Sequence, residues 1–493
     1  MKDTPSSNEA DTPTAQSTES PATEPGSAPM ETAARFERIL PPAGRGGGER
    51  FTKSTTFRMM LVGILILLML IPLSMVRSIV DERAEAYSTV LSDISAHWGG
   101  EQVLTGPILL VPCTQSTVVV DQRTDDKGNV TSVQREVIEE FRAVLLPKKI
   151  HLEGALKPEY RFRGIYQSLV YAEHLTLTGR FEGTERTVKS LAKEGWTLRI
   201  HWDKAYVVVG LSDTKGITRI SPFRFGDQTV DFAPGTRLPN IIASGFHAPL
   251  TGESPDENAA FSLEMDLKGS TGFRMSPVGE LSEMHLTSTW AHPSFYGEIL
   301  PSKRTVTAQG FDATWSIPHL VRAYPQYWLD TGEPQSLLTS FSLGVRLFEP
   351  ITIYTEATRA VKYGILFIAL TFLTLALLEI ITKSRPSMVQ YVLIGTAVTL
   401  FYVLLIALAE HIGFNAAYFV AAATVVILNT GYCFFVLSRK LLALVVTAVL
   451  SALYSVLFMA LRAEDYALLT GSILLAAATA VTMFFTRNLH KRI

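Results

Sequence analysis

Six long apolar runs constrain this chain more than any other feature, because each is long enough to cross a membrane. One lies near the start, and five are crowded together between residues 360 and 485. A helix needs roughly 20 residues to cross about 30 Å of hydrocarbon, and there it must satisfy its backbone polar groups internally. We therefore predict six transmembrane helices, at residues 59–76, 361–381, 389–409, 414–437, 441–461 and 466–485.

Basic residues predict the orientation of these spans, since short cytoplasmic connections are enriched in Lys and Arg. The connections 410–413 and 462–465 carry a single basic residue, Arg462. On the other side of a six-span topology lie four basic clusters: Arg50, Lys53 and Arg58; Lys383 and Arg385; Arg439 and Lys440; Arg487, Lys491 and Arg492. The sequence therefore predicts that both termini lie in the cytoplasm.

The segment between the first two spans, residues 81–358, is too long and too polar for a loop. We predict a folded domain outside the cytoplasm, in the periplasm of a Gram-negative source. It opens with an apolar stripe at helical spacing, which predicts a helix continuing from the first span. The stripe consists of Val80, Ala84, Tyr87, Leu91 and Ile94.

Beyond Gly100 the apolar period changes to two, as in Leu263, Met265 and Leu267. This pattern predicts antiparallel strands with one wet face. More than two hundred residues of it indicate one large β-sandwich or two smaller sheets. The predicted fold is an α-helical membrane bundle of six transmembrane helices plus a large, β-rich, antiparallel and sandwich-like periplasmic domain.

The domain organisation follows from these patterns. Residues 1–54 are rich in Ser, Thr, Pro, Glu and Ala, which predicts a disordered cytoplasmic tail. The first transmembrane helix covers residues 59–76 and the periplasmic β-rich domain covers 81–358. A five-helix transmembrane bundle follows at 361–485, and residues 486–493 form a short cytoplasmic tail.

Composition and motifs argue against several classes of function. A net charge of −2 disfavours a nucleic-acid partner. Cys113 lies in the outer domain and Cys433 in the fourth span, so no disulfide is predicted. Ten histidines are scattered without paired spacing, so we predict no metal site, and no motif indicates a cofactor.

The outer domain contains part of a serine-enzyme motif. Ser190-Leu191-Ala192-Lys193 matches the Ser-x-x-Lys pattern of penicillin-interacting enzymes, but no Lys-Thr-Gly accompanies it. We predict that the protein is not an enzyme, with a periplasmic hydrolase as an open alternative.

One stretch of the outer domain carries a family resemblance: Trp290-Ala291-His292-Pro293-Ser294-Phe295-Tyr296-Gly297, followed by Leu300-Pro301 and Gly310-Phe311. It resembles the signature of the CreD family of bacterial inner-membrane proteins. The membrane half is similar to that family as well, at Gln390-Tyr391, residues 409–414, Asn429 and residues 486–488. The resemblance covers roughly residues 55 to 490.

The resemblance implies an inner-membrane protein linked to cell-envelope integrity, to a two-component regulatory system and to tolerance of envelope-directed agents including β-lactams. It brings no agreed enzymatic activity. We predict envelope maintenance through a periplasmic binding or scaffolding domain, with membrane lipids, envelope components or other membrane proteins as partners. The alternative is a transporter or lipid-handling protein that uses the helical bundle, although coupled transport usually needs ionisable residues at membrane depth.

Three polar residues near the spans are candidates. Glu410 and His411 stand where the third span meets the outer interface, and they are either a proton- or ligand-sensitive pair or an ordinary helix end. We expect Glu410 and His411 to couple the domain to the bundle. They would contact basic groups of the two helices that connect the domain to the membrane, near Arg77 and Arg359. Asn429 lies deeper, where an amide most often bonds to a neighbouring helix.

The signature stretch supplies the other candidates, which are Trp290, His292, Pro293, Ser294 and Phe295. Adjacent residues seldom form a nucleophile and base pair, because that geometry comes from separated segments. The proline restricts His292 to an extended conformation, so the stretch favours a packed turn over a catalytic site.

Overall fold

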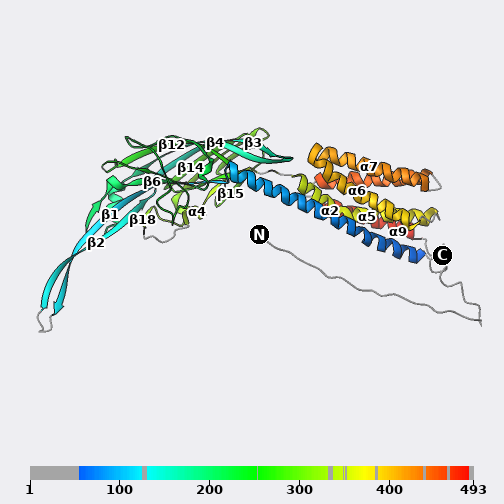
Figure 1. The fold of residues 1–493 in the computed structure, drawn as a ribbon, viewed down its shortest axis with the longest axis horizontal. Coiled ribbons are helices and arrows are strands. Elements are labelled where there is room, and N and C mark those ends of the chain that lie inside the picture. The colour runs from blue at the N-terminus through cyan, green and yellow to red at the C-terminus, as the bar shows by residue number, and fades with distance from the viewer. Residues whose placement is uncertain are drawn as a thin grey trace, which may run out of the picture. The chain divides into compact units, whose positions relative to one another are not determined.

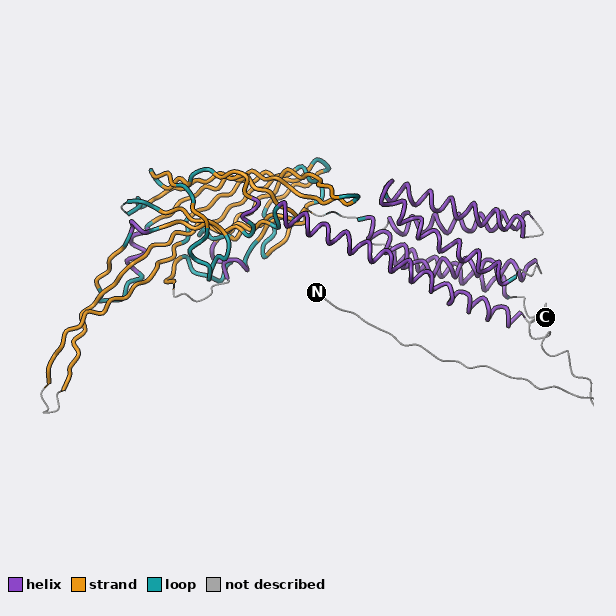
Figure 2. The backbone as a smooth tube through the Cα atoms, in the orientation of Figure 1, coloured by secondary structure: helices purple, strands orange, loops and turns teal. Residues whose placement is uncertain are grey.

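The computed structural model describes residues 55–124, 130–252, 254–330, 337–347, 349, 352–382, 387–436, 440–462 and 467–487. Val62–Ile493 forms one compact unit and Met1–Leu61 another. The predicted tail at residues 1–54 lies outside the described residues, as do Lys383, Arg385, Arg439, Lys491 and Arg492. Within the compact unit, strands and long helices are segregated in space (Figure 2).

The long helices follow the predicted spans. They are α2 (Thr55–Trp98), α5 (Ile353–Thr382), α6 (Met388–Ile412), α7 (Phe414–Val436), α8 (Lys440–Arg462) and α9 (Ala467–Thr486). Among the described residues, α2 and α5 to α8 are long and apolar enough to cross a membrane, which makes five candidate spans. The described residues therefore support five of the six predicted spans. In α9, which has 20 residues, the apolar stretch runs from Gly471 to Phe484 and is shorter than the roughly 20 residues of a full span.

The helix α2 continues well beyond the predicted first span, as its apolar stripe predicted. It is unbroken through Pro72 and has 44 residues. Val80 is buried, while the intervening Asp81, Glu82 and Arg83 are exposed. A single helix therefore carries the chain from the first span to the start of the β domain.

Ten strands of the described chain form the first sheet, in the order β10-β11-β6-β1-β13-β19-β15, with β2, β5 and β18 paired off this path. Their bounds are β1 (Gln102–Thr124), β2 (Val130–Leu145), β5 (Thr197–Ile200), β6 (Tyr206–Leu211), β10 (Ala233–Pro234), β11 (Gly245–Pro249), β13 (Gly272–Ser276), β15 (Pro293–Gly297), β18 (Tyr327–Asp330) and β19 (Leu343–Leu347). Past Ser116 and Ile138, β1 and β2 continue as a long hairpin (Figure 1).

Nine described strands form the second sheet, in the order β16-β17-β14-β3-β4-β12-β8-β9, with β7 paired to β12. Their bounds are β3 (Lys149–Arg163), β4 (Tyr166–Glu182), β7 (Ile217–Ile220), β8 (Phe223–Phe225), β9 (Gln228–Val230), β12 (Asn258–Ser270), β14 (Leu281–Ser288), β16 (Lys303–Thr307) and β17 (Gly310–Pro318). Short helices connect the strands: α3 (Thr184–Ser190), α4 (Leu337–Ser340), η1 (Trp202–Lys204), η2 (Thr214–Gly216) and η3 (His319–Val321).

The strands confirm a β-rich domain, but the prediction of a purely antiparallel sheet is wrong. β1 pairs with β13 in parallel, and β14 pairs with β3 in parallel. Both pairs join strands far apart in the sequence. Alternation of apolar residues reports which face is buried and not the direction of a neighbouring strand, so it could not reveal these pairs.

One core fills the β domain, because buried side chains of both sheets belong to a single cluster. Phe295 of β15 lies across from Trp315 of β17, with ring centroids 5.8 Å apart. Elsewhere, Phe232 contacts both Phe223 of β8 and Phe246 of β11. The two sheets therefore pack on each other and do not form separate subdomains.

Candidate functional site

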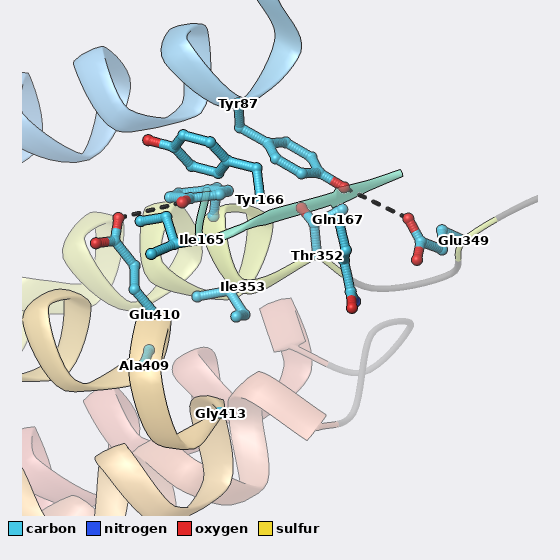
Figure 3. A pocket seen from close by; sticks show the side chains of 11 residues that line it. Tyr87, Ile165, Tyr166, Gln167, Glu349, Thr352, Ile353, Ala409, Glu410 and Gly413 are labelled. Carbon is cyan, nitrogen blue, oxygen red and sulfur yellow. Dashed lines mark hydrogen bonds between the residues drawn. The ribbon is translucent and has the colours of Figure 1, made fainter. Parts of the chain in front are cut away.

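A small cavity of about 200 Å³ lies where the hairpin of β3 and β4 meets the helices α2, α5 and α6 (Figure 3). Its lining residues come from segments far apart in the sequence. They are Tyr87, Ile165, Tyr166, Gln167, Glu349, Thr352, Ile353, Tyr354, Ala409, Glu410 and Gly413.

The local sequence explains how these side chains are placed. Gly164 and Ile165 form the turn between β3 and β4, and Gly164 has a φ of 61°, a left-handed conformation that glycine adopts without strain. The turn makes Tyr166 the first residue of β4. At the other side, Gly413 ends α6 with a φ of 77°, and its N–H donates to the carbonyl of Ala409 at 3.1 Å. Glu410 therefore lies in the last turn of α6.

Three tyrosines from three elements converge on the cavity. The ring centroid of Tyr87 on α2 lies 5.9 Å from that of Tyr166 and 5.2 Å from that of Tyr354 on α5. The centroids of Tyr166 and Tyr354 are 6.4 Å apart. Tilted aromatic pairs at such distances attract each other by about 0.5 to 1.5 kcal/mol each beyond their burial.

Two carboxylates complete the arrangement. The hydroxyl of Tyr354 donates to Glu410 Oε1 at 3.1 Å, and that of Tyr87 donates to Glu349 Oε2 at 3.5 Å (Figure 3). We call Tyr87, Tyr166, Tyr354, Glu349 and Glu410 the junction cluster. Burial, followed by the Glu349 carboxylate, raises the pKa of the neighbouring Tyr160 to about 12, so this phenol stays neutral and acts as a donor.

A basic residue of α2 is a charged neighbour of Glu410. Arg83, one turn before Tyr87, interacts with the hydroxyl group of Tyr166 and electrostatically with the carboxylate of Glu410. Arg77, by contrast, pairs with Asp81 on its own helix at 3.8 Å. The junction cluster thus joins α2, α5, α6 and the β3–β4 hairpin through aromatic and charged contacts together.

The other two membrane candidates lie elsewhere. His411 is exposed and does not line the cavity, so the structure separates it from Glu410. Asn429 is buried, and its Nδ2 donates to the carbonyl of Val425 in its own helix at 3.0 Å, where a bond to a neighbouring helix was expected.

The signature stretch forms β15 and the turn before it. His292 and Ser294 are exposed, and Pro293 begins the strand. Trp290 donates through Nε1 to the carbonyl of His292 at 3.1 Å, while Phe295 packs into the core. None of these contacts brings a nucleophile to a base.

Tyr296 of this stretch contacts several charged side chains. Its hydroxyl donates to Glu101, and Arg274 holds the other oxygen of that carboxylate at 2.9 Å. The guanidinium of Arg346 lies 4.5 Å from the centre of the Tyr296 ring. Burial, followed by the Glu101 carboxylate, raises the pKa of Tyr296. We call Glu101, Arg274, Tyr296 and Arg346 the latch cluster, because Glu101 follows α2 and Arg346 precedes α5.

The serine-enzyme motif is not assembled. Ser190 Oγ donates to the carbonyl of Thr187 at 2.7 Å, and Lys193 Nζ binds the carboxylate of Glu139 at 2.6 Å. The helix α3 ends at Ser190, so the serine and the lysine do not share a helical face. Within the described part of the chain, no group of three or more His, Cys, Asp or Glu residues could hold a metal ion.

The size of the cavity decides what the junction can do. Sites for small-molecule ligands are roughly 300 to 1,000 Å³, larger than the cavity here. Its phenols and carboxylates suit a joint between elements, with room for a few waters. Sequence patterns missed Tyr87, Tyr166, Tyr354 and Glu349 as a site. The available signal was weak: Gly164 lies two residues before Tyr166, and Tyr87 and Tyr354 lie close to the ends of the polar segment between the first two spans.

Comparison with known proteins identifies the family. The family model described as Inner membrane protein CreD matches residues 54–491. Inner membrane protein CreD of Escherichia coli strain K12 is 33% identical over 428 residues, which cover 86% of this chain and 91% of the relative. The chain therefore belongs to the CreD family of inner membrane proteins.

Proposed function

We propose that this inner membrane protein maintains the cell envelope by coupling a periplasmic β domain to its helical bundle. The observation that carries the proposal is the junction cluster, in which the β3–β4 hairpin meets α2, α5 and α6. A hydrogen bond to a charged group contributes about 1.5 to 3 kcal/mol when it is sheltered from water. Such a joint transmits a movement of the domain to α5 and α6.

The latch cluster supports the same function from the domain side. Glu101 lies just beyond α2, and Arg346 lies on the last strand before α5. Tyr296 and Arg274 link the two. A ligand or envelope component that binds the domain would therefore act on both connections to the membrane at once.

We also propose that the β domain is periplasmic, that both termini are cytoplasmic, and that α9 crosses the membrane as a sixth helix. The four basic clusters on one side of the spans support this topology. Fusions to alkaline phosphatase test it: a fusion at residue 252 should be active, and one at residue 440 should be inactive. High phosphatase activity at residue 440 would overturn the topology.

The proposed function is tested in cells that lack this protein, challenged with a β-lactam. Wild-type protein should restore growth, whereas Tyr166→Ala and Glu410→Ala should fail while reaching the same abundance in the membrane. His411→Ala is the matched control, because His411 is adjacent in sequence but lies outside the cavity. Full rescue by both cluster variants would contradict a role for the junction.

We propose that this role involves no catalysis. The engagement of Ser190 by Thr187 and of Lys193 by Glu139 supports this. Labelled penicillin should leave the wild-type protein unlabelled. Acylation that disappears in Ser190→Ala would instead revive the hydrolase alternative.

A lipid-handling role is the second candidate. An apolar groove of about 410 Å³ among α5, α8 and α9 favours it. Under this alternative, substitutions in the groove would abolish β-lactam tolerance, whereas the junction variants would retain it.

A further inference from the structure

An apolar groove lies among α5, α8 and α9, and the coupling function makes no use of it. Its volume of about 410 Å³ falls within the roughly 300 to 1,000 Å³ of ligand sites. Leu, Val and Ala side chains line it, together with Thr374 and Thr482.

The chemistry of the lining requires a hydrocarbon occupant. The hydroxyl of Thr374 donates to the carbonyl of Leu370 at 2.8 Å, and that of Thr482 donates to the carbonyl of Ala478 at 2.7 Å. Both hydroxyl groups therefore already donate within their own helices. A polar ligand would therefore lose its hydrogen bonds to water here and find only two hydroxyl oxygens as acceptors to replace them.

The shape of the groove suits an acyl chain. The part of α9 that lines the groove runs from Leu474 to Thr482, which is about 12 Å along the helix axis. A single hydrocarbon chain lies along such an apolar length, and binding of a transmembrane helix instead is an outcome that the cross-linking experiment below distinguishes.

Basic residues stand at one end of the groove. Most of its lining residues come from the second half of α5, the first half of α8 and the second half of α9, which places it toward the start of α8 and the end of α9. Lys440 begins α8 and Arg487 follows α9, and both are exposed. Each stands five residues beyond the nearest lining residue of its helix, Val445 or Thr482, which corresponds to about 7.5 Å along the axis.

The nearby carboxylate is engaged elsewhere. Glu379 of α5 follows the lining residue Leu378 and accepts a hydrogen bond from the hydroxyl of Tyr391 of α6 at 2.8 Å. Lys440 and Arg487 therefore provide positive charge within reach of a phosphate at the membrane surface, while an attached chain enters the groove.

We propose that the groove binds one anionic phospholipid, with an acyl chain between α5, α8 and α9 and its phosphate held by Lys440 and Arg487. The site prefers phosphatidylglycerol or cardiolipin over a zwitterionic lipid, because two cations act on the headgroup. It is independent of the junction cluster, and its failure would leave the coupling function untouched.

Native mass spectrometry of the full-length protein, released from mild detergent after exchange into defined lipids, tests the proposal. One phosphatidylglycerol should be retained on the order of tenfold better than phosphatidylcholine with the same chains. The double variant Lys440→Ala/Arg487→Ala should lose this preference. Lys362→Ala, which removes an exposed cation from the first half of α5, should keep it. Equal retention of both lipids by the wild type would overturn the headgroup assignment.

The groove itself is tested by filling it. Ala477→Trp should reduce bound lipid of either kind, whereas Ala476→Trp, on the adjacent exposed position outside the groove, should not. Equal numbers of bound lipids in the two variants would mean that the lipid belongs to the ordinary lipid layer around the protein, and this would contradict the proposal. A photo-reactive residue at 477 should yield a lipid adduct in membranes. An adduct with a protein helix instead would reassign the groove to protein association.

Discussion

The β domain and the helical bundle hold their interiors together differently. In the domain, alternate residues of both sheets fill one core around Trp315, which is 1% exposed. In the bundle, the rings of Phe401, Tyr418 and Tyr454 meet at the centre, and the Tyr418 hydroxyl donates to the carbonyl of Tyr454 at 2.6 Å. Water drives the burial of apolar groups in the domain, but lipid removes most of that drive from the bundle. Buried apolar side chains therefore stabilise the two regions by different means.

The largest expected effect separates the two regions directly. Trp315→Ala should destabilise the β domain by about 3 to 5 kcal/mol, because it removes a buried ring and leaves a cavity. Phe401→Ala should lower the stability of the bundle by less. Part of the loss in a water-soluble domain is the free energy of transferring the side chain from water into the core, and a side chain that packs in a membrane comes from hydrocarbon instead. Chemical unfolding of the full chain in detergent, followed by protease resistance of each region, measures both. Equal losses of stability in the two variants would contradict the proposed difference between the domain and the bundle.

The second prediction concerns a buried carboxyl group of the domain. Both oxygens of Glu173 on β4 lie in the interior without a hydrogen-bond partner, and burial raises its pKa well above the ordinary value. The folded state therefore holds a proton that the unfolded state releases above about pH 4.3, and stability falls as pH rises from there to the folded pKa.

The expected slope is about −1.4 kcal/mol per pH unit in that window. Glu173→Gln, which resembles the protonated form, should flatten it and raise stability near pH 7. Glu264→Gln on β12, at a more exposed position, is the control and should leave the slope in place. An unchanged slope in Glu173→Gln would assign the pH dependence to other groups.

The third prediction sharpens the comparison where the two regions meet. Tyr354→Phe and Glu410→Gln should show a coupling energy of about 1 to 2 kcal/mol in a double-mutant cycle on thermal unfolding. Tyr354→Phe combined with His411→Gln should show none, because His411 lies outside the junction cluster. Additive effects of the first pair would mean that their hydrogen bond contributes little.

The smallest effect reports on the domain alone. Cys113 is buried, and burial raises the pKa of its thiol to about 12. In a Cys433→Ser background, a maleimide at pH 8 should therefore label the folded protein far more slowly than the unfolded chain. Rapid labelling of the native state would show that the core around Cys113 opens readily.

Much of the fold could be predicted from local patterns. Leu263, Met265 and Leu267 alternate with more exposed residues along β12, and Val80 begins the stripe that α2 buries. Strand direction and the count of spans could not be predicted in the same way. A parallel partner depends on residues far away in the sequence. The described apolar stretch of α9 is also shorter than the apolar run predicted from the sequence.

The sequence by itself determined that the chain has membrane helices, a β-rich domain between the first two of them, and Glu410 at a helix end. Each is a property of neighbouring residues, such as hydropathy, periodicity or a glycine after a helix. Only the tertiary structure decided that Tyr166 from a hairpin tip reaches Tyr354 and lies beside Arg83, and that His411 lies outside the cavity. Those outcomes depend on how distant segments pack against each other, and the spacing of residues along one segment does not encode that packing.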